Sequence, residues 1–311
     1  MLNHKADIKS IFYILITIGL FFFQWLISGL YWPVYGGYLF LSVAISVIIH
    51  NHIHNPIWKS RRLNQLTDHV LTVFYGFPIF GWIPTHVKNH HVHVNKQPDY
   101  TKTYWVSERN NLLTLISYPS ISGYYQNSAI GRFMKETYHK NRKKFYTYIA
   151  QIITLVIWIA VAFILDWQKA LIFVIIPQQV SIFSVLIFNY VQHVHADEES
   201  EYNHSRNIMG SLNFFLFNNG LHTIHHQYPG MHWSKLPHKH KEIDHLVDDR
   251  LKEPNLIWYL IRVYIVGVFV PSARTRNFRE ERMKSRFNSL GTNSQSMNEP
   301  KINLFDASVR E

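Results

Sequence analysis

The sequence predicts an all-α integral membrane protein, in which four transmembrane helices form two hairpins and a helical cap lies on their cytoplasmic side. Three observations predict this class. Four apolar runs are long enough to cross a bilayer, each hairpin turn is only a few residues long, and the polar segments after the second and fourth runs are rich in histidine. A chain of 311 residues could form one large domain or two ordinary ones, so hydropathy decides the class and length does not.

The first two apolar runs form the first hairpin. Residues 11–30 contain no charged side chain, and a helix needs about twenty such residues to cross the hydrocarbon layer. Tyr31 and Trp32 follow at a place where interfacial aromatic residues are expected. After this short turn, a second run covers residues 34–50 and carries His50 at its far end.

The second hairpin and two shorter apolar segments complete the pattern. Residues 145–165 and 170–190 are two long apolar runs separated by a turn of four residues. Val70 to Pro84 is also apolar, but it is short and broken by two prolines, which predicts a re-entrant or interfacial helix. The stretch from Ile257 to Val270 is interrupted by Arg262, so we expect it to lie along the membrane surface.

Basic residues predict the orientation of the chain. The hairpin turns are nearly uncharged, and the basic residues between the second and third spans are Lys59, Arg61, Arg62, Lys88, Lys140, Arg142, Lys143 and Lys144. By the positive-inside rule, both termini and a cap formed by residues 51–144 and 191–287 are cytoplasmic, in a bacterial inner membrane or an equivalent membrane. Residues 1–287 form one domain, and the polar residues 288–311 are expected to be a disordered tail.

Charge and cysteine content exclude several classes of function. The formal net charge of +11 follows from the basic cytoplasmic segments, so nucleic-acid binding is not expected. A basic face at the membrane would instead attract anionic lipid headgroups or an acidic electron-transfer partner. The chain has no cysteine, which excludes disulfides, thiolate-ligated haem and an Fe–S cluster held by this chain.

Histidine is the strongest anomaly, with twenty residues in the chain. Spacings of three or four residues place the members of a cluster on one helical face. Four clusters are predicted at the cytoplasmic surface: His50 and His54; His86, His90 and His91; Asn189 and His193; and His222, His225 and His226. Nine imidazoles and one amide exceed what one ion accepts, so two metal ions are predicted, and Zn, Cu, Fe and Ni all stay open.

The remaining histidines are interpreted differently. Isolated ones, such as His139 and His204, are expected to be polar anchors at the membrane interface. His52, His93 and His195 lie within two residues of predicted ligands but off their helical phase. Structural or supporting roles are therefore expected for these three.

Three of the clusters resemble the histidine boxes of the membrane fatty acid desaturase and hydroxylase superfamily. The matching patterns are His50-x3-His54, His86-x3-His90-His91 and His222-x2-His225-His226. Asn189-x3-His193 is similar to the Asn and His that members of this family contribute from their last span. The resemblance extends from about His50 to His240 and includes the four-span topology.

The resemblance implies a cofactor, a substrate and a partner. It implies a cytoplasmic centre of two Fe2+ ions, O2 as the co-substrate, a lipid or fatty acyl substrate, and electrons from an external ferredoxin-, rubredoxin- or cytochrome-type carrier. Asn189 would bind metal directly or through water. The other ligands carried over by position are His50, His54, His86, His90, His91, His193, His222, His225 and His226.

The resemblance leaves the reaction open between related chemistries. Asn51 and Asn55 stand where many desaturases have Asp and Gly in the first box. Fatty acid desaturation is favoured, but hydroxylation or terminal-alkene formation on a fatty acid, an alkane or a carotenoid would use the same site. A His-rich metal transporter or sensor is the alternative from another class. It is disfavoured because the four runs carry no ionisable residue near their midpoints.

Overall fold

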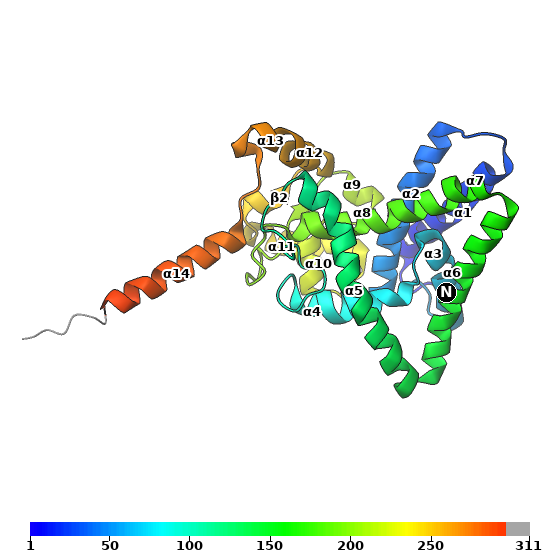
Figure 1. Ribbon diagram of the computed structural model, residues 1–311, viewed down its shortest axis with the longest axis horizontal. Helices are drawn as coiled ribbons and strands as arrows, with labels where there is room; N and C mark the ends of the chain where they lie inside the picture. The colour runs from blue at the N-terminus through cyan, green and yellow to red at the C-terminus, as the bar shows by residue number, and fades with distance from the viewer. Residues whose placement is uncertain (297–311) are drawn as a thin grey trace, which may run out of the picture.

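The computed structural model describes residues 1–296, and this part of the chain is mostly helical with very little sheet (Figure 1). Two short strands, β1 (Asn207–Ile208) and β2 (Lys252–Glu253), pair in parallel. Three stretches have π-helical hydrogen bonding: Ile83–His90, Leu171–Ile175 and Arg262–Val266. The α-helices are α1 (Ile8–Leu26), α2 (Trp32–His54), α3 (Arg61–Tyr75), α4 (His91–His93), α5 (Leu112–Lys140), α6 (Arg142–Leu165), α7 (Trp167–Ala170), α8 (Ile176–His193), α9 (Leu212–Phe215), α10 (His222–Gln227), α11 (Leu236–Ile243), α12 (Leu256–Ile261), α13 (Gly267–Phe269) and α14 (Phe278–Ser296).

Four helical segments of the described chain are long and apolar enough to cross a membrane, which confirms the predicted number of spans: Lys5–Leu26, Trp32–His54, Arg142–Leu165 and Trp167–His193. Two boundaries differ from the prediction. α1 ends at Leu26 because the turn after it contains Gly29 with a positive φ of 83°, a conformation that glycine adopts at little cost. α2 begins earlier than expected, since Pro33 is tolerated in a first helical turn, and it continues to His54.

The central pair of spans is α2 and α8, which pack along each other. Pro177 has no backbone N–H, so it cannot bond to the carbonyl of Phe173 four residues earlier. The hydroxyl of Tyr38 donates to that carbonyl (3.1 Å), and the hydroxyl of Tyr35 donates to the neighbouring carbonyl of Ile172 (2.8 Å). Two tyrosines of α2 therefore satisfy the backbone that the irregular start of α8 leaves open, as a bilayer interior requires.

A sharp bend follows α3, where the sequence predicted a break between Val70 and Pro84. α3 and the helical segment Ile79–His93 meet at 95°. Gly76 ends α3 with a φ of 84°, and a Cβ atom there would lie only 2.5 Å from Cβ of Gln178 in α8. The amide of Gln178 donates to the carbonyl of Val73 at the open end of α3 (2.7 Å). The bend is thus held against α8, and it aims the second histidine cluster at the ends of the central spans.

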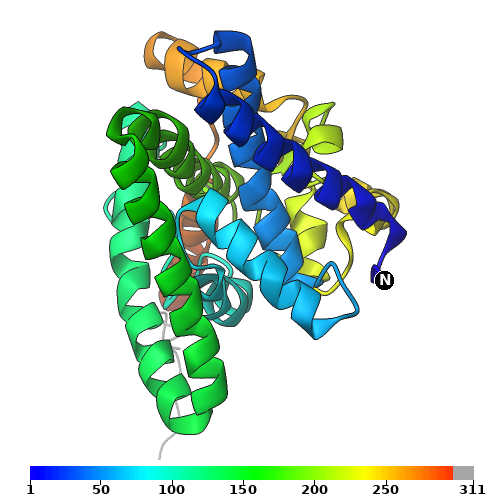
Figure 2. The ribbon, with the colours of Figure 1, turned by 90° about the vertical axis from the view of Figure 1, so that its right-hand side faces the viewer.

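The other helices surround this centre. Figure 2 shows the long α5–α6 hairpin along one side and α1, α2 and α3 on the other. α12 and α13 form the short apolar segment predicted at the surface, with Ile257, Trp258 and Phe269 exposed. Arg262, which interrupts it, turns inward and pairs with Glu253 (2.6 Å).

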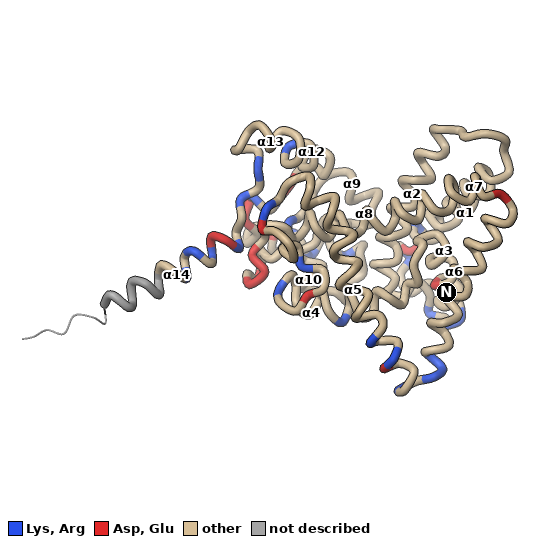
Figure 3. Tube along the Cα trace, in the orientation of Figure 1, with Lys and Arg blue, Asp and Glu red and all other residues tan. Residues whose placement is uncertain are grey.

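Most charged residues lie at helix ends and near the C-terminal helix, away from the apolar middle of the hairpins (Figure 3). Figure 3 shows Lys and Arg at the α5–α6 turn and around the base of α14, while the hairpins carry few charges. The described residues include α14 to Ser296, so the helix extends into the first part of the predicted tail. Its start is stabilised by pairs such as Lys284 with Glu280 (2.6 Å), from which the helix propagates. The rest of the predicted tail lies outside the described residues.

Candidate metal centre

The nine predicted histidine ligands meet in two groups, and within each group one ring nitrogen per residue lies within 4.8 Å of the others. They come from the C-terminal ends of α2 and α8, from the bent segment before and within α4, and from α10. The five-histidine group contains His50, His54, His86, His91 and His225. The four-histidine group contains His90, His193, His222 and His226.

The division between the groups differs from the predicted pairing in the second cluster. The sequence placed His86 and His90 on one face, one turn apart. The segment Ile83–His90 is π-helical, so residues five apart come together instead. His86 and His91 therefore share the five-histidine group, while His90 turns to the four-histidine group. In the ordinary helix α10 a spacing of four still holds, and only His225 of its three histidines faces the other group.

Ring nitrogens in the five-histidine group are in closer contact than hydrogen bonds alone explain. The Nε2 atom of His225 lies 2.9 Å from that of His50 and 3.1 Å from that of His91. Nε2 of His91 lies 3.0 Å from Nε2 of His86. An imidazole nitrogen carries either one hydrogen or one lone pair, so it can join only one such bond. The shared nitrogens need a further partner, and a metal ion between their lone pairs would supply it.

The four-histidine group shows the same geometry. Nε2 of His222 lies 2.9 Å from Nε2 of His193 and 3.1 Å from Nε2 of His226. Two nitrogens bound at right angles to one ion, each at about 2.1 Å, are about 3.0 Å apart. The observed spacings therefore fit nitrogen ligands around one metal ion in each group.

The electrostatics of the rings also suit metal binding. Burial, followed by the neighbouring histidines, holds the pKa of His222, His225 and His226 well below the usual value. These rings are therefore neutral at neutral pH, and neutral imidazole is the form that binds a metal. The buried Nε2 atoms of His54 and His90 have no hydrogen-bond partner in the part of the chain that the structure describes. The donor set fits two divalent ions, and its chemistry suits iron among others.

Two residues beside the ligands were missed by the sequence analysis. Asp99 accepts a hydrogen bond from Nδ1 of His90 (2.9 Å), and Thr101 donates to the same carboxylate through its hydroxyl (2.8 Å). Burial alone would raise the pKa of Asp99, but charge interaction with His90 and these hydrogen bonds hold it well below the usual range. The sequence does contain a feature that could have identified Asp99, because it is a carboxylate that follows shortly after the second histidine cluster in an otherwise basic segment.

Asn189, predicted to bind metal directly or through water, is not part of either histidine group but lines a cavity that His50, His86 and His222 also line. Its Nδ2 atom donates to the carbonyl of Thr101 (3.2 Å) and to the hydroxyl of Tyr118 (2.6 Å). Since these partners occupy the amide nitrogen, Oδ1 is the atom left to face a metal ion or a water molecule. Gln192 is held in the same way, because its Nε2 atom donates to the carbonyl of Asn219 (2.8 Å).

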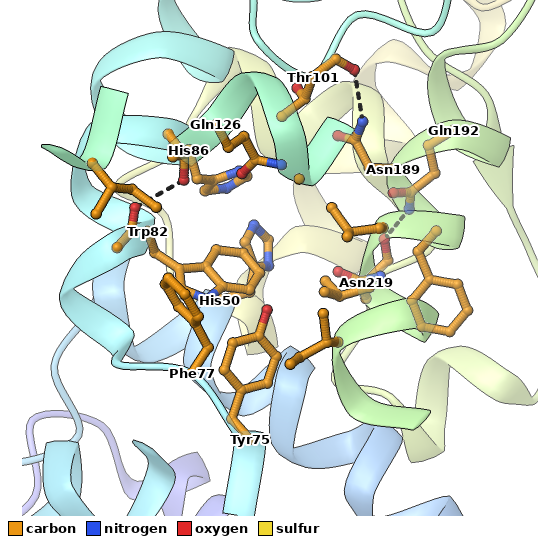
Figure 4. Close-up of a pocket in the computed structure, with 18 of the residues that line it drawn as sticks. His50, Tyr75, Phe77, Trp82, His86, Thr101, Gln126, Asn189, Gln192 and Asn219 are labelled. Carbon is orange, nitrogen blue, oxygen red and sulfur yellow. Dashed lines mark hydrogen bonds between the residues drawn. The ribbon is translucent and has the colours of Figure 1, made fainter. Parts of the chain in front are cut away.

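A cavity of about 140 Å³ adjoins both groups (Figure 4). His50 and His86 of the five-histidine group and His222 of the four-histidine group line it. Aromatic side chains such as Trp82 and Tyr75, aliphatic side chains and several uncharged amides form the rest of the wall. Among the described residues that line it there is no Lys, Arg, Asp or Glu. The cavity can therefore hold an uncharged, mainly apolar molecule next to both sites.

The other histidines stay outside the two groups. His139 is exposed, as expected of an isolated histidine. His204 differs from the prediction, because it is buried with its ring 5.6 Å from that of His226 and its carbonyl accepts from Nδ1 of His193. His52 bonds to Asp68, and His195 to the Thr275 hydroxyl and the Glu108 carbonyl, which agrees with structural roles. His93 belongs to neither group.

Fold and site together define a class: a helical membrane protein with two histidine groups able to hold metal ions beside one apolar cavity. The family model named fatty acid desaturase matches residues 23–279, which is most of the chain. The chain belongs to the fatty acid desaturase family, and the resemblance of its histidine boxes is thereby confirmed. A search of curated proteins and a search of solved structures each returned no match.

Proposed function

We propose that the protein is a membrane-bound, O2-dependent fatty acid desaturase that uses two Fe2+ ions to insert a double bond into a fatty acyl chain. The observation that supports this best is the cavity, because its wall includes ligands from both histidine groups. A chain bound there would have one stretch of carbon atoms beside both metal sites. Family membership supports the same class of reaction.

The residues of this chain would bind, orient and shield the substrate. Trp82, Tyr75 and Phe77 give the cavity an apolar wall that holds an acyl chain and excludes water (Figure 4). The uncharged lining favours the apolar part of the substrate, so a charged headgroup or carrier would stay outside. Bound iron would supply the activation of O2 that removal of hydrogen from an unactivated carbon requires. The histidines keep the metal sites fixed while the cavity selects the carbon atoms.

The electron donor and the orientation belong to the same proposal. The described chain offers no cysteine ligand for an Fe–S cluster, so an external ferredoxin-, rubredoxin- or cytochrome-type carrier would deliver electrons. Exposed basic residues such as Arg61, Arg62 and Lys88 would lie on the cytoplasmic side of a bacterial inner membrane or an equivalent membrane. Both termini would share that side.

Mass spectrometry of lipids and hydrocarbons from cells with and without the gene tests the reaction. New double bonds in acyl chains are expected with the intact protein and not with His225→Ala, which lacks one proposed ligand. If the products were hydroxylated lipids or terminal alkenes, the same site would catalyse hydroxylation or alkene formation and not desaturation. An unchanged profile in cells that supply O2 and a donor would overturn the proposal.

Elemental analysis tests the cofactor separately. Purified protein should contain close to two iron atoms per chain, since the nine histidines form two ligand groups. Stoichiometric zinc without iron would reject the O2-dependent chemistry. His225→Ala should retain less iron than the intact protein at equal membrane insertion, because it removes a ligand and no apolar span.

A further inference from the structure

In each of the histidines compared, Nε2 faces the other rings of its group and Nδ1 points away from them. The two groups differ in the protein atoms that contact these Nδ1 atoms. Nδ1 of His90 bonds to Asp99, and Nδ1 of His193 donates to the carbonyl of His204 at 3.1 Å. Both belong to the four-histidine group. The buried Nδ1 atoms of His222 and His226 in the same group, and of His50 and His91 in the five-histidine group, have no partner in the described part of the chain. Within the described residues, the difference between the groups is the carboxylate of Asp99, which contacts a ring of the four-histidine group alone.

Asp99 is fixed more firmly than a single contact to His90 would require. Its side chain is fully buried (0% exposed). The backbone N–H groups of Asn95 (2.8 Å) and Thr101 (2.7 Å) donate to its two oxygens, and the Thr101 hydroxyl donates at 2.8 Å. With so many fixed donors, the carboxylate has one orientation, and it presents Oδ2 to the His90 ring.

This arrangement determines the form of His90. A neutral imidazole facing a carboxylate places its hydrogen on Nδ1, so Nε2 keeps the lone pair that a metal ion accepts. That Nε2 atom is buried and has no hydrogen-bond partner within the described residues. A buried carboxylate is also costly unless a positive charge lies near. A metal ion on the far side of the ring would provide that charge.

We propose that Asp99 is a positioning residue for the metal centre, which holds His90 as an Nε2 ligand and makes the two metal sites unequal. The inference rests on the two metal ions of the proposed function. Loss of the carboxylate weakens metal retention at the four-histidine site and leaves the five-histidine site as it was. Removal of such a partner typically lowers metal affinity about 10- to 100-fold.

The chain contains a matched control. His52 and Asp68 form a similar pair, with Nε2 of His52 3.1 Å from the carboxylate, and His52 is nearly buried (4% exposed). Nδ1 of His52 accepts from the backbone N–H of Ile57, so both ring nitrogens are occupied by the protein. Asp68→Asn thus makes the same chemical change as Asp99→Asn at a histidine that belongs to neither group.

The experiment follows metal release from the full-length protein in detergent. Intact protein, D99N and D68N are loaded with 57Fe2+, the iron per chain is measured, and a chelator is added. In D99N one of two iron atoms should leave about 10 to 100 times faster than in the intact protein, and the other at the original rate. D68N should release iron as the intact protein does. Mössbauer spectra of D99N should show a change in only one of two iron components.

Equal release from D99N and the intact protein would overturn the inference, as would a faster release of both iron atoms to the same extent. Should D99N fail to accumulate, Thr101→Val tests the same cluster and keeps the side-chain shape, because the hydroxyl that it removes lies 2.8 Å from Oδ1 of Asp99 and 2.8 Å from Nδ1 of His90. A smaller acceleration of one iron atom is expected there, and no change would count against the inference. Zinc in the intact protein would reject the proposed function alone, since the comparison between variants can be repeated with zinc.

Discussion

Helices α2 and α6 are both long, apolar and able to cross a membrane, yet their surroundings differ. In the most apolar stretch of α2, 56% of the residues are buried inside the protein. In the corresponding stretch of α6, 11% are buried. α2 packs against α1, α3 and α8 and ends in His50 and His54. α6 leaves many apolar side chains exposed, among them Ile153 and Ile157. The helix that ends in the histidine groups is therefore enclosed by protein, while α6 leaves an apolar face exposed.

The difference in burial between α2 and α6 has a physical reason. A ligand must be held close to its productive position, so the helix that carries it needs contacts on every side. A helix that only anchors the protein gains little from protein contacts over lipid contacts, because lipid tails are as apolar as its own side chains. Substitutions should therefore act strongly along α2 and at its histidine end, and weakly along α6.

The largest effect is expected at the histidine end of α2. His50→Ala removes a member of the five-histidine group, so product formation should fall by more than the roughly 10- to 100-fold that loss of a supporting partner costs. His139→Ala, just before α6, should change little, because His139 is exposed and outside both groups. Lipid product per milligram of membrane protein measures both. An equal loss in the two variants at matched protein levels would contradict the assignment of the groups.

A matched pair of isoleucines tests the body of the two helices. Ile45 in α2 is fully buried (0% exposed), and Ile157 in α6 is 56% exposed. Ile45→Ala leaves a cavity and should cost about 2–5 kcal/mol, whereas Ile157→Ala should stay within about 0.5 kcal/mol. Thermal denaturation of both variants in one detergent measures the difference. A similar loss in both would mean that α6 has a protein partner on its exposed face.

A pair of glycines extends the comparison to the turns. Gly29 and Gly76 both have a positive φ, near 83° and 84°. A Cβ atom at Gly29 meets nothing within 4 Å, but at Gly76 it lies 2.5 Å from Cβ of Gln178. Both Ala variants carry the left-handed backbone cost of about 1–2 kcal/mol, and Gly76→Ala adds overpacking of about 1–3 kcal/mol. Denaturation midpoints should rank G76A below G29A, and the reverse order would show that the bend can move away from α8.

The sequence predicted the parts of the molecule that depend on local pattern. Length and hydropathy are local properties, so the four spans were predicted, with errors of a few residues at Gly29 and Trp32. Helical spacing likewise indicated all nine histidines that the structure brings together. The fatty acid desaturase family was also correctly indicated by those spacings.

Features that depend on irregular backbone or on distant contacts were not predictable. The π-helical segment before His91 changes which histidines share a group, and a normal helical repeat gives no sign of it. Asp99 becomes a partner of His90 only through the fold of the loop after α4. His204 was expected to be a polar anchor at the membrane interface, but it is buried and its ring lies 5.6 Å from that of His226, a contact that the local sequence does not indicate.

The smallest expected effect concerns the exposed basic residues near the start of α3 and the start of α6. Exposed basic residues lie at the start of α3, at Lys88 and at the α5–α6 turn, where Lys140, Arg142, Lys143 and Lys144 follow one another (Figure 3). If these charges recruit an acidic electron carrier, turnover with a protein donor should fall several-fold between low and high salt, since the Debye length is about 8 Å near physiological ionic strength. Turnover with a small neutral reductant should change little.

The two reductants are needed because anionic lipid headgroups compete for the same basic residues and could alone account for them. Lipid binding would respond to salt in the same way whichever reductant is used, since it acts on the enzyme and not on the donor. Docking of a carrier would respond only when the carrier is present. Reversing the charge of Lys143 and Lys144 to Glu should then lower turnover with the protein donor and spare the neutral reductant, because both side chains are exposed and outside the histidine groups. The same salt response with both reductants would limit these charges to fixing the orientation in the membrane.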